Sequence, residues 1–242
     1  MGFNNLGLEH FKKRLARYSG LAPIGANVGA NKESEDRTGD YETGIAATAT
    51  KADYLTLNIS SPNTPGLRGL QNKSALEDLL TRCGAAVTKA SDATPPPTFL
   101  KVAPDLDDEA IADIVNVVKT EGAWLAGLIV SNTTLARPST LSSPYQHETG
   151  GLSGAPLMAA STEVLKAFAR TLDGAFDLIG VGGISSGSDA YAKIRAGANA
   201  VQLYSALVYH GPALVTEIKR DLVGHLKEDG FNSVCEAVGA DL

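Results

Sequence analysis

The stretch DYLTLNISSPNTPGLRGLQ, residues 53–71, decides the fold, because an apolar run in it ends abruptly in a polar, proline-rich segment. The run at residues 54–59 has the composition of a β-strand. Within residues 58–65 lie two asparagines, two serines, a threonine and two prolines. A plain turn needs only roughly one or two such residues. The segment is therefore predicted to hold a bound molecule.

The same alternation of apolar runs and amphipathic segments continues on both sides of this stretch. Strands are predicted at residues 22–28, 54–59, 98–103, 126–131, 176–181 and 200–204. Helices are predicted at residues 8–18, 40–51, 74–89, 108–120, 162–172, 188–196 and 212–228. The helix at 74–89 opens with Ser74-Ala75-Leu76-Glu77, which has the pattern of a capping box.

Strict βα alternation predicts an α/β fold with a parallel sheet wrapped by helices. A barrel and an open doubly wound sheet both fit the pattern. Polar or glycine-rich clusters after nearly every strand favour the (β/α)8 TIM barrel, whose βα loops share one functional face. Only six strands are recognisable, so we expect a single domain over residues 1–242 with six βα units and the first two strands missing. An open sheet is the alternative.

Composition excludes several classes of protein. The 242 residues carry a net charge of -6 without a basic run, which argues against a nucleic-acid partner. Cys83 and Cys235 stand apart without a metal-binding spacing, so we expect neither a metal nor a disulfide. No apolar stretch approaches the ~18 residues of a membrane span.

Polar residues stand at predicted strand ends, where a barrel interior should be apolar. They are Asn27, Asn58, Ser61, Lys101 and the run Ser131-Asn132-Thr133-Thr134. A capping or turn role is the alternative for each. That alternative is weakest for Lys101 in FLKVAP, because a lysine among apolar neighbours must find a partner or lose hydration energy. A bound anion would supply that partner.

Glycine-rich segments predict a phosphate site. Gly180-Val181-Gly182-Gly183 precedes a helix expected near Ser188, and residues 150–154 form a second glycine-rich loop. Backbone amides in such turns bind anions. Tyr204-Ser205 ends the last strand, where barrels often bind phosphate. His147 is expected to be a surface loop residue, and Asp105 is expected to start the following helix.

Six ordered motifs resemble the dihydroorotate dehydrogenase family over essentially the whole chain. They are NISSPNTPGLRGLQ, LKVAPDL, IVSNTT, ETGGLSGAPL, IGVGGISSG and AVQLYSAL. The resemblance implies FMN-dependent oxidation of dihydroorotate to orotate in pyrimidine biosynthesis. Serine at Ser61, where class 1 members have cysteine, implies class 2, which passes electrons to a membrane quinone.

The resemblance also implies a role for each polar strand end. Ser61 would be the catalytic base, with Thr64 as a relay for its proton through a water. Contacts to the substrate would come from Phe3, Asn58, Asn63, Asn132 and Thr133. Contacts to FMN would come from Asn27, Asn58, Lys101, Ser131, Gly154, Gly183, Tyr204 and Ser205. Lys101 would lie by the flavin ring, and the glycines with Tyr204 and Ser205 would hold the phosphate.

The chain departs from the family at its N-terminus. Of an Asn-Arg-x-Gly-Phe motif only Gly2-Phe3 is present. From the resemblance we expect that the chain lacks the membrane-associating segment of class 2. We therefore expect that this chain alone binds FMN weakly or not at all and has little activity. Localisation at the bacterial cytoplasmic membrane is expected, with the mitochondrial inner membrane as the alternative. A non-catalytic fragment and another phosphate-binding barrel enzyme, such as an isomerase or aldolase, are the alternative functions.

Overall fold

A computed structural model describes residues 5–91 and 94–242, and the chain divides into two compact units. The first unit comprises residues up to Lys101 together with Asp113–Ala126. The second comprises Val102–Ala112 and Gly127–Leu242. Helix α4, Asp108–Lys119, has residues in both units. The single domain predicted from the sequence stays a prediction.

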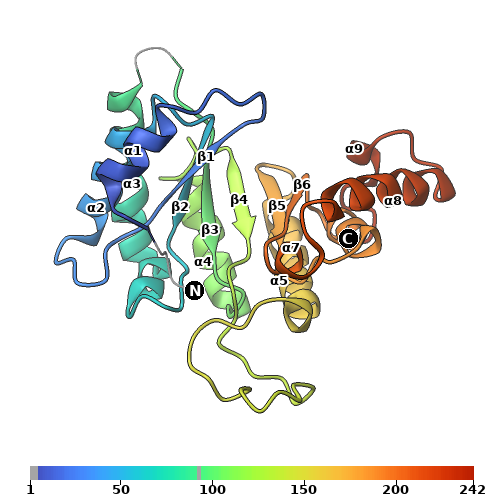
Figure 1. Ribbon diagram of the computed structural model, residues 1–242. Coiled ribbons are helices and arrows are strands. Elements are labelled where there is room, and N and C mark those ends of the chain that lie inside the picture. Colours follow the sequence, from blue (N-terminus) through green and yellow to red (C-terminus); the bar gives the residue numbers. More distant parts are fainter. Residues whose placement is uncertain (1–4, 92–93) are drawn as a thin grey trace. The chain divides into compact units, whose positions relative to one another are not determined.

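The first unit is a parallel sheet with helices packed on it (Figure 1). Its strands are β1 (Gly25–Val28), β2 (Tyr54–Asn58) and β3 (Thr98–Val102), of which the last residue, Val102, is counted in the second unit. Its helices are α1 (Leu8–Leu15), α2 (Arg37–Thr48), the 3-10 turn η1 (Leu67–Gln71) and α3 (Lys73–Ala90). In Figure 1 the helices α2 and α3 lie side by side.

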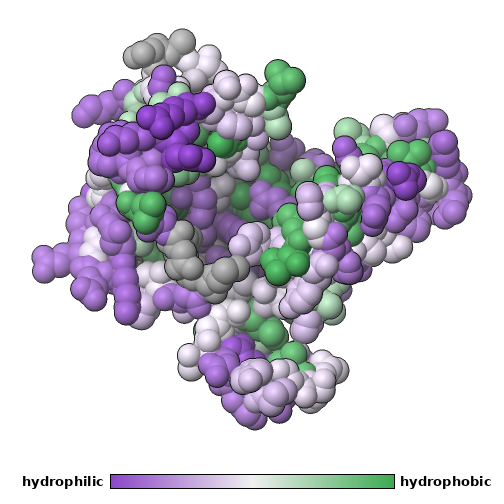
Figure 2. All heavy atoms as spheres, viewed as in Figure 1, coloured by the Kyte–Doolittle hydropathy of each residue, from purple (hydrophilic) through white to green (hydrophobic). Residues whose placement is uncertain are grey.

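The core of the first unit lies between one face of this sheet and the helices. Leu55, Leu57 and Leu100 point to this face and are 0% exposed. Helices α2 and α3 contribute Tyr41, Ile45, Leu76, Leu79, Leu80 and Cys83, also fully buried. The outer surface of α1 to α3 is mostly hydrophilic (Figure 2). One helix face is therefore apolar and the other is solvated, as the amphipathic patterns predicted.

The second unit repeats the arrangement with a further set of strands and helices. Its strands β4 (Gly127–Val130), β5 (Asp177–Val181) and β6 (Ala200–Gln202) are parallel neighbours. Its remaining elements are η2 (Ala155–Leu157), α5 (Met158–Leu172), α6 (Gly187–Arg195), α7 (Ser205–His210), α8 (Leu214–Glu228) and α9 (Val234–Ala237). Leu165 and Phe168 of α5 are fully buried, and Leu178 of β5 is nearly so.

The six predicted strands are all present, and the helix boundaries are confirmed within a few residues. The prediction of a capping box at Ser74 is wrong. Helix α3 begins one residue earlier, at Lys73, and its N-cap is Asn72, with no capping bond from that side chain. Helix α6, which was predicted to begin near Ser188, begins at Gly187. The hydroxyl of Ser186 accepts a hydrogen bond from the Asp189 amide and caps this helix.

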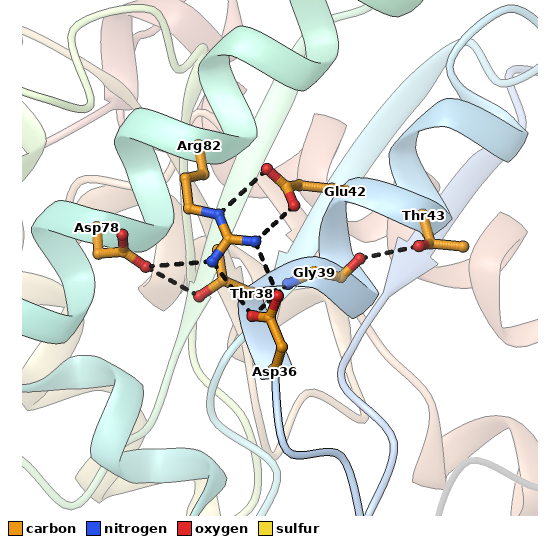
Figure 3. A network of polar contacts seen from close by, with 7 residues as sticks. All are labelled: Asp36, Thr38, Gly39, Glu42, Thr43, Asp78 and Arg82. Atoms are coloured by element: carbon orange, nitrogen blue, oxygen red, sulfur yellow. Dashed lines mark hydrogen bonds and ion pairs between the residues drawn. The ribbon is translucent and has the colours of Figure 1, made fainter.

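An arginine joins the first turn of α2 to the middle of α3 (Figure 3). Arg82 donates to Glu42 at 2.6 Å and to Asp36 at 3.0 Å, and lies 3.8 Å from Asp78. Asp36 is also the N-cap of α2 and accepts from the Gly39 amide at 2.9 Å. The hydrogen bonds from Arg82 are the main reason that the pKa values of Asp36 and Glu42 are lowered.

Replacing this arginine should make the first unit less sensitive to acid. A lowered carboxyl pKa stabilises the fold above the ordinary values of 3.8 and 4.5, and that contribution disappears as the pH falls through the folded values. Arg82→Met should therefore be less stable than the parent at neutral pH, and the difference should shrink toward about pH 3. Urea midpoints across this range measure it, with exposed Lys51→Met as control. A difference that stays constant with pH would contradict the assignment.

Candidate functional site

The strand register of the first unit gathers polar side chains on the sheet face opposite the core. Asn58 lies beside Lys101, and Asn27 lies beside Thr56. Paired residues on neighbouring parallel strands point to the same face, and so do residues two apart on one strand. Asn27, Asn58 and Lys101, all predicted from the sequence, therefore share one face at the carboxyl end of β1 to β3.

Asn58 and Ser60 are held by a set of buried hydrogen bonds. The Tyr41 hydroxyl of α2 donates to the Asn58 carbonyl at 2.7 Å. The Asn58 side-chain oxygen lies 3.3 Å from both the amide and the hydroxyl oxygen of Ser60. Ser60 in turn donates to the Lys101 carbonyl at 2.7 Å. The start of the loop after β2 is thereby fixed to its neighbouring strand.

The β2 loop, residues 59–66, presents Ser61 in a nearly buried position. Ser61 is 4% exposed and Thr64 is 8% exposed, whereas Asn63 is exposed. The Asn63 amide donates to the Ser61 hydroxyl oxygen at 3.3 Å. This bond uses a lone pair of the oxygen and leaves its proton uncommitted. A proton relay from Ser61 to Thr64 stays a prediction.

Two arginines that the sequence reasoning missed support the β2 loop. Arg37 of α2 donates to the Pro65 carbonyl at 2.7 Å, and Arg68 of η1 donates to the Ser60 carbonyl at 3.2 Å. Carbonyls in a proline-rich loop lack neighbouring strand donors, so Arg68, which lies close to the loop in the sequence, is a signal that could have been read. Arg37 is distant in the sequence and gave no such signal. The loop is thus clamped at both of its ends.

Lys101 is partly buried, and this burial lowers the pKa of its ammonium group. Desolvation is the only cause of the shift, so among the described residues no carboxylate offsets it. The lysine is therefore desolvated without a compensating carboxylate among the described residues. Binding of an anion by Lys101 stays a prediction.

The second unit holds the predicted residues that follow β4. Ser131 is 1% exposed, and its amide donates to the Val181 carbonyl at 3.1 Å. The Asn132 amide donates to the Val102 carbonyl at 2.9 Å. The Asn132 side-chain oxygen accepts from the Thr133 amide at 2.8 Å. Residues 131–133 are therefore placed at the carboxyl end of β4 by both main-chain and side-chain bonds.

Asp105 supports this segment. The prediction that Asp105 starts the next helix is wrong. Its carboxylate accepts a short hydrogen bond from the Thr134 hydroxyl and another from the Leu135 amide at 3.1 Å. Helix α4 is capped instead by Asp107, which accepts from the Ala110 amide at 2.9 Å. The error arose because two aspartates stand two residues apart before one helix.

The glycine-rich turns of the second unit form a backbone cradle. Gly154 has φ +81° and Gly183 has φ +82°, conformations that favour glycine. A Cβ on Gly154 would lie 4.0 Å from the Ser205 Cβ, so these two predicted residues are neighbours. The Ser205 hydroxyl lies 2.9 Å from that of Ser153. Helix α7 begins at Ser205, next to exposed Tyr204. Binding of a phosphate at these positions stays a prediction.

The remaining predictions have mixed outcomes. His147 is exposed, in agreement with a surface position, and Phe3 lies outside the described residues. Cys83 is buried and Cys235 is exposed, and neither is in a disulfide. Within residues 5–91 and 94–242, no cluster of three or more His, Cys, Asp or Glu residues could hold a metal ion. No helix in that part of the chain is long and apolar enough to cross a membrane.

Parallel strands that alternate with helices and carry polar residues at their carboxyl ends are typical of barrel-type α/β proteins. The family model of dihydroorotate dehydrogenase matches residues 1–226. The chain belongs to the dihydroorotate dehydrogenase family.

Named relatives and solved structures agree with this assignment. The chain is 54% identical over 241 residues to a dihydroorotate dehydrogenase (quinone) of Rhodospirillum rubrum, covering 100% of this chain and 65% of that protein. It is 55% identical over 247 residues to the protein of that name from Xanthobacter autotrophicus, covering 100% of this chain and 68% of that one. A ferulenol complex of the Eimeria tenella enzyme superposes with a TM-score of 0.93 at 37% identity, over 99% of this chain and 70% of that chain. The structural match confirms the barrel-type α/β fold with six βα units.

Removing the Tyr41 hydroxyl should weaken the support of the β2 loop. Tyr41 is 0% exposed, and burial raises the pKa of its phenol. Tyr41→Phe should lower the free energy of unfolding by about 1 kcal/mol, the usual net value of one buried hydrogen bond. Chemical denaturation measures the change. Tyr145→Phe is the matched control, because Tyr145 is 73% exposed. Equal stability of the two variants would show that the bond to Asn58 contributes nothing.

Proposed function

We propose that this protein takes part in the oxidation of dihydroorotate to orotate in pyrimidine biosynthesis, with FMN as hydride acceptor and a quinone as final electron acceptor. The observation that carries the proposal is Ser61, nearly buried on a loop that Arg37 and Arg68 clamp. Family membership and the name that the relatives share, dihydroorotate dehydrogenase (quinone), support it. The chain spans 65% of the length of the Rhodospirillum rubrum relative, so the reaction is proposed for the protein of which these residues are part.

The residues present fit FMN in two respects. The glycine cradle at Gly154 and Gly183, with the amides at Tyr204 and Ser205, suits a phosphate because close approach of an anion requires backbone without side chains. Lys101 supplies a positive charge whose desolvation a bound anion would offset. We propose that Lys101 lies by the flavin ring and that Asn27, Asn58 and Ser131 bind the cofactor through their polar side chains.

The chemistry that FMN supplies when bound is acceptance of the hydride that leaves C6 of dihydroorotate. The task left to the protein is removal of the proton on C5. We assign this step to the hydroxyl oxygen of Ser61, which has few competing contacts on its loop. A serine hydroxyl is a poor base at neutral pH, so the proton must pass onward as it is taken up. We propose that the proton passes through a water to Thr64, which is also nearly buried.

Side-chain amides are proposed to recognise the substrate. Dihydroorotate presents amide edges and a carboxylate, and asparagine can donate and accept at the same time. We assign this role to Asn58 and Asn63 after β2 and to Asn132 and Thr133 after β4. Phe3 is proposed to help close the site. The quinone in the relatives' name points to a reaction partner in a membrane, and we propose peripheral attachment to the bacterial cytoplasmic membrane. The mitochondrial inner membrane is the alternative.

The test of this proposal begins with flavin binding. Purified chain should quench the fluorescence of added FMN in a saturable way, and Lys101→Met should weaken this binding because the ring loses its nearby charge. With an excess of FMN under anaerobic conditions, dihydroorotate should bleach the flavin absorbance. Ser61→Ala should bind FMN as the parent does. Its flavin should bleach at least about 100-fold more slowly, since a general base contributes at least about that factor.

Ser143→Ala, in an exposed loop of the second unit, is the matched control and should behave as the parent. Absence of saturable quenching would contradict the cofactor assignment for this chain. If FMN fluorescence is quenched but Ser61→Ala bleaches at the parent's rate, the cofactor assignment stands and the assignment of Ser61 as the base is wrong.

A further inference from the structure

A buried lysine lies behind the glycine turn at residues 182–183 and has no part in the function proposed above. Lys193 of α6 is 0% exposed. Its ammonium group donates to the Ser161 hydroxyl at 2.6 Å and lies 3.5 Å from the Met158 carbonyl. Lysine is almost never fully buried unless it is paired, so a position of this kind calls for an explanation.

Ser161 links this lysine to two other segments of the second unit. Its hydroxyl oxygen lies 2.8 Å from the Leu157 carbonyl at the start of α5 and 3.1 Å from the Gly182 carbonyl. A hydroxyl has one proton to donate and can accept at the same time. Ser161 therefore accepts from Lys193 while donating to one of these carbonyls, and it joins α6, α5 and the glycine turn in one network.

The glycine turn packs so closely on α5 that its position depends on this network. Gly182 has φ +117°, and a Cβ there would lie 2.8 Å from the Ser161 hydroxyl oxygen. A Cβ on Gly183 would lie 2.5 Å from the Met158 Cα. Both residues that Lys193 contacts, Met158 and Ser161, thus form the surface on which the turn rests.

We propose that Lys193 is a positioning residue which, through Ser161, fixes the peptide groups of Gly182 and Gly183 for binding of a phosphate group. The proposal rests on the proposed function for the identity of that phosphate, which is the FMN phosphate. It assigns a role to a side chain that does not itself touch the ligand. It also gives the buried amine a reason to be retained, since an apolar residue would fill the same volume without a desolvation cost.

The charge of Lys193 should be coupled to anion binding at the turn. Burial lowers the pKa of Lys193 to about 7, and the charge of Asp189 partly opposes this. Asp189 is held by the amide and hydroxyl of Ser185 at 2.9 and 3.0 Å. Among the described residues it is the one charged side chain that acts on the lysine. An anion at the turn should favour the protonated amine, and by linkage the protonated amine should favour the anion.

The first experiment measures FMN affinity by fluorescence quenching from about pH 6 to about pH 9, across the lowered pKa of the lysine. Lys193→Met and Ser161→Ala should each weaken FMN binding about 10-fold near neutral pH, as outer contacts of a binding site commonly do. The double variant should lose little more than either single variant, because both act through one bond. In the parent, affinity should fall above neutral pH, and Lys193→Met should lack this fall. Lys166→Met, a partly exposed lysine on α5, should match the parent.

The second experiment needs no cofactor and separates this proposal from the proposed function. Amide hydrogen exchange of the peptide that contains Gly182 and Gly183 should be faster in Lys193→Met and Ser161→Ala than in the parent or Lys166→Met. If the parent binds no FMN but exchange responds in this way, the cofactor assignment fails and the positioning role stands. If exchange and FMN affinity in both variants equal those of the parent, the proposal is overturned. Should Lys193→Met fail to fold, Ser161→Ala alone decides between these outcomes.

Discussion

The parallel register between β2 and β3, which sets Asn58 beside Lys101, is the constraint on which the first unit depends. Because side chains alternate across a strand, this one register sends Leu57 and Leu100 into the helix-covered core and the polar pair to the opposite face. A slip of one residue would bury the amide and the ammonium group among the leucines. The apolar core and the polar strand ends are therefore consequences of the same alignment.

Polar groups that the fold must bury are placed where they also hold functional segments. Tyr41 lies in the core, yet its hydroxyl ends on the Asn58 carbonyl, at the point where the strand becomes a loop. Lys193 is fully buried as well, and its ammonium group ends on the Ser161 hydroxyl behind the glycine turn. In both cases a helix delivers one hydrogen bond to the backbone or side chain beneath a loop. The same hydrogen bond satisfies the buried donor and fixes the loop.

Two of the clamps on the loops come from parts of the chain that are distant in sequence. Arg37 reaches Pro65 across 28 residues, and Asp105 reaches Leu135 across 30. A loop rich in proline and glycine offers carbonyls without strand partners, and such charged side chains supply the missing contacts. Rigidity of the β2 loop therefore results from the helices around it as well as from its own Pro62 and Pro65.

The sequence by itself determined the α/β fold, the six strands and the polar residues at their carboxyl ends, because hydrophobic period and turn chemistry are local properties. It also carried the family resemblance, through motifs that are contiguous in the chain. It misplaced the caps of α3 and α4, since neighbouring residues offered equal local signals. Only the tertiary structure decided that Tyr41 and Arg37 support the β2 loop and that Lys193 lies under the glycine turn. These contacts join residues far apart in the chain, and a side chain's burial depends on which elements pack over it rather than on its own neighbours in sequence.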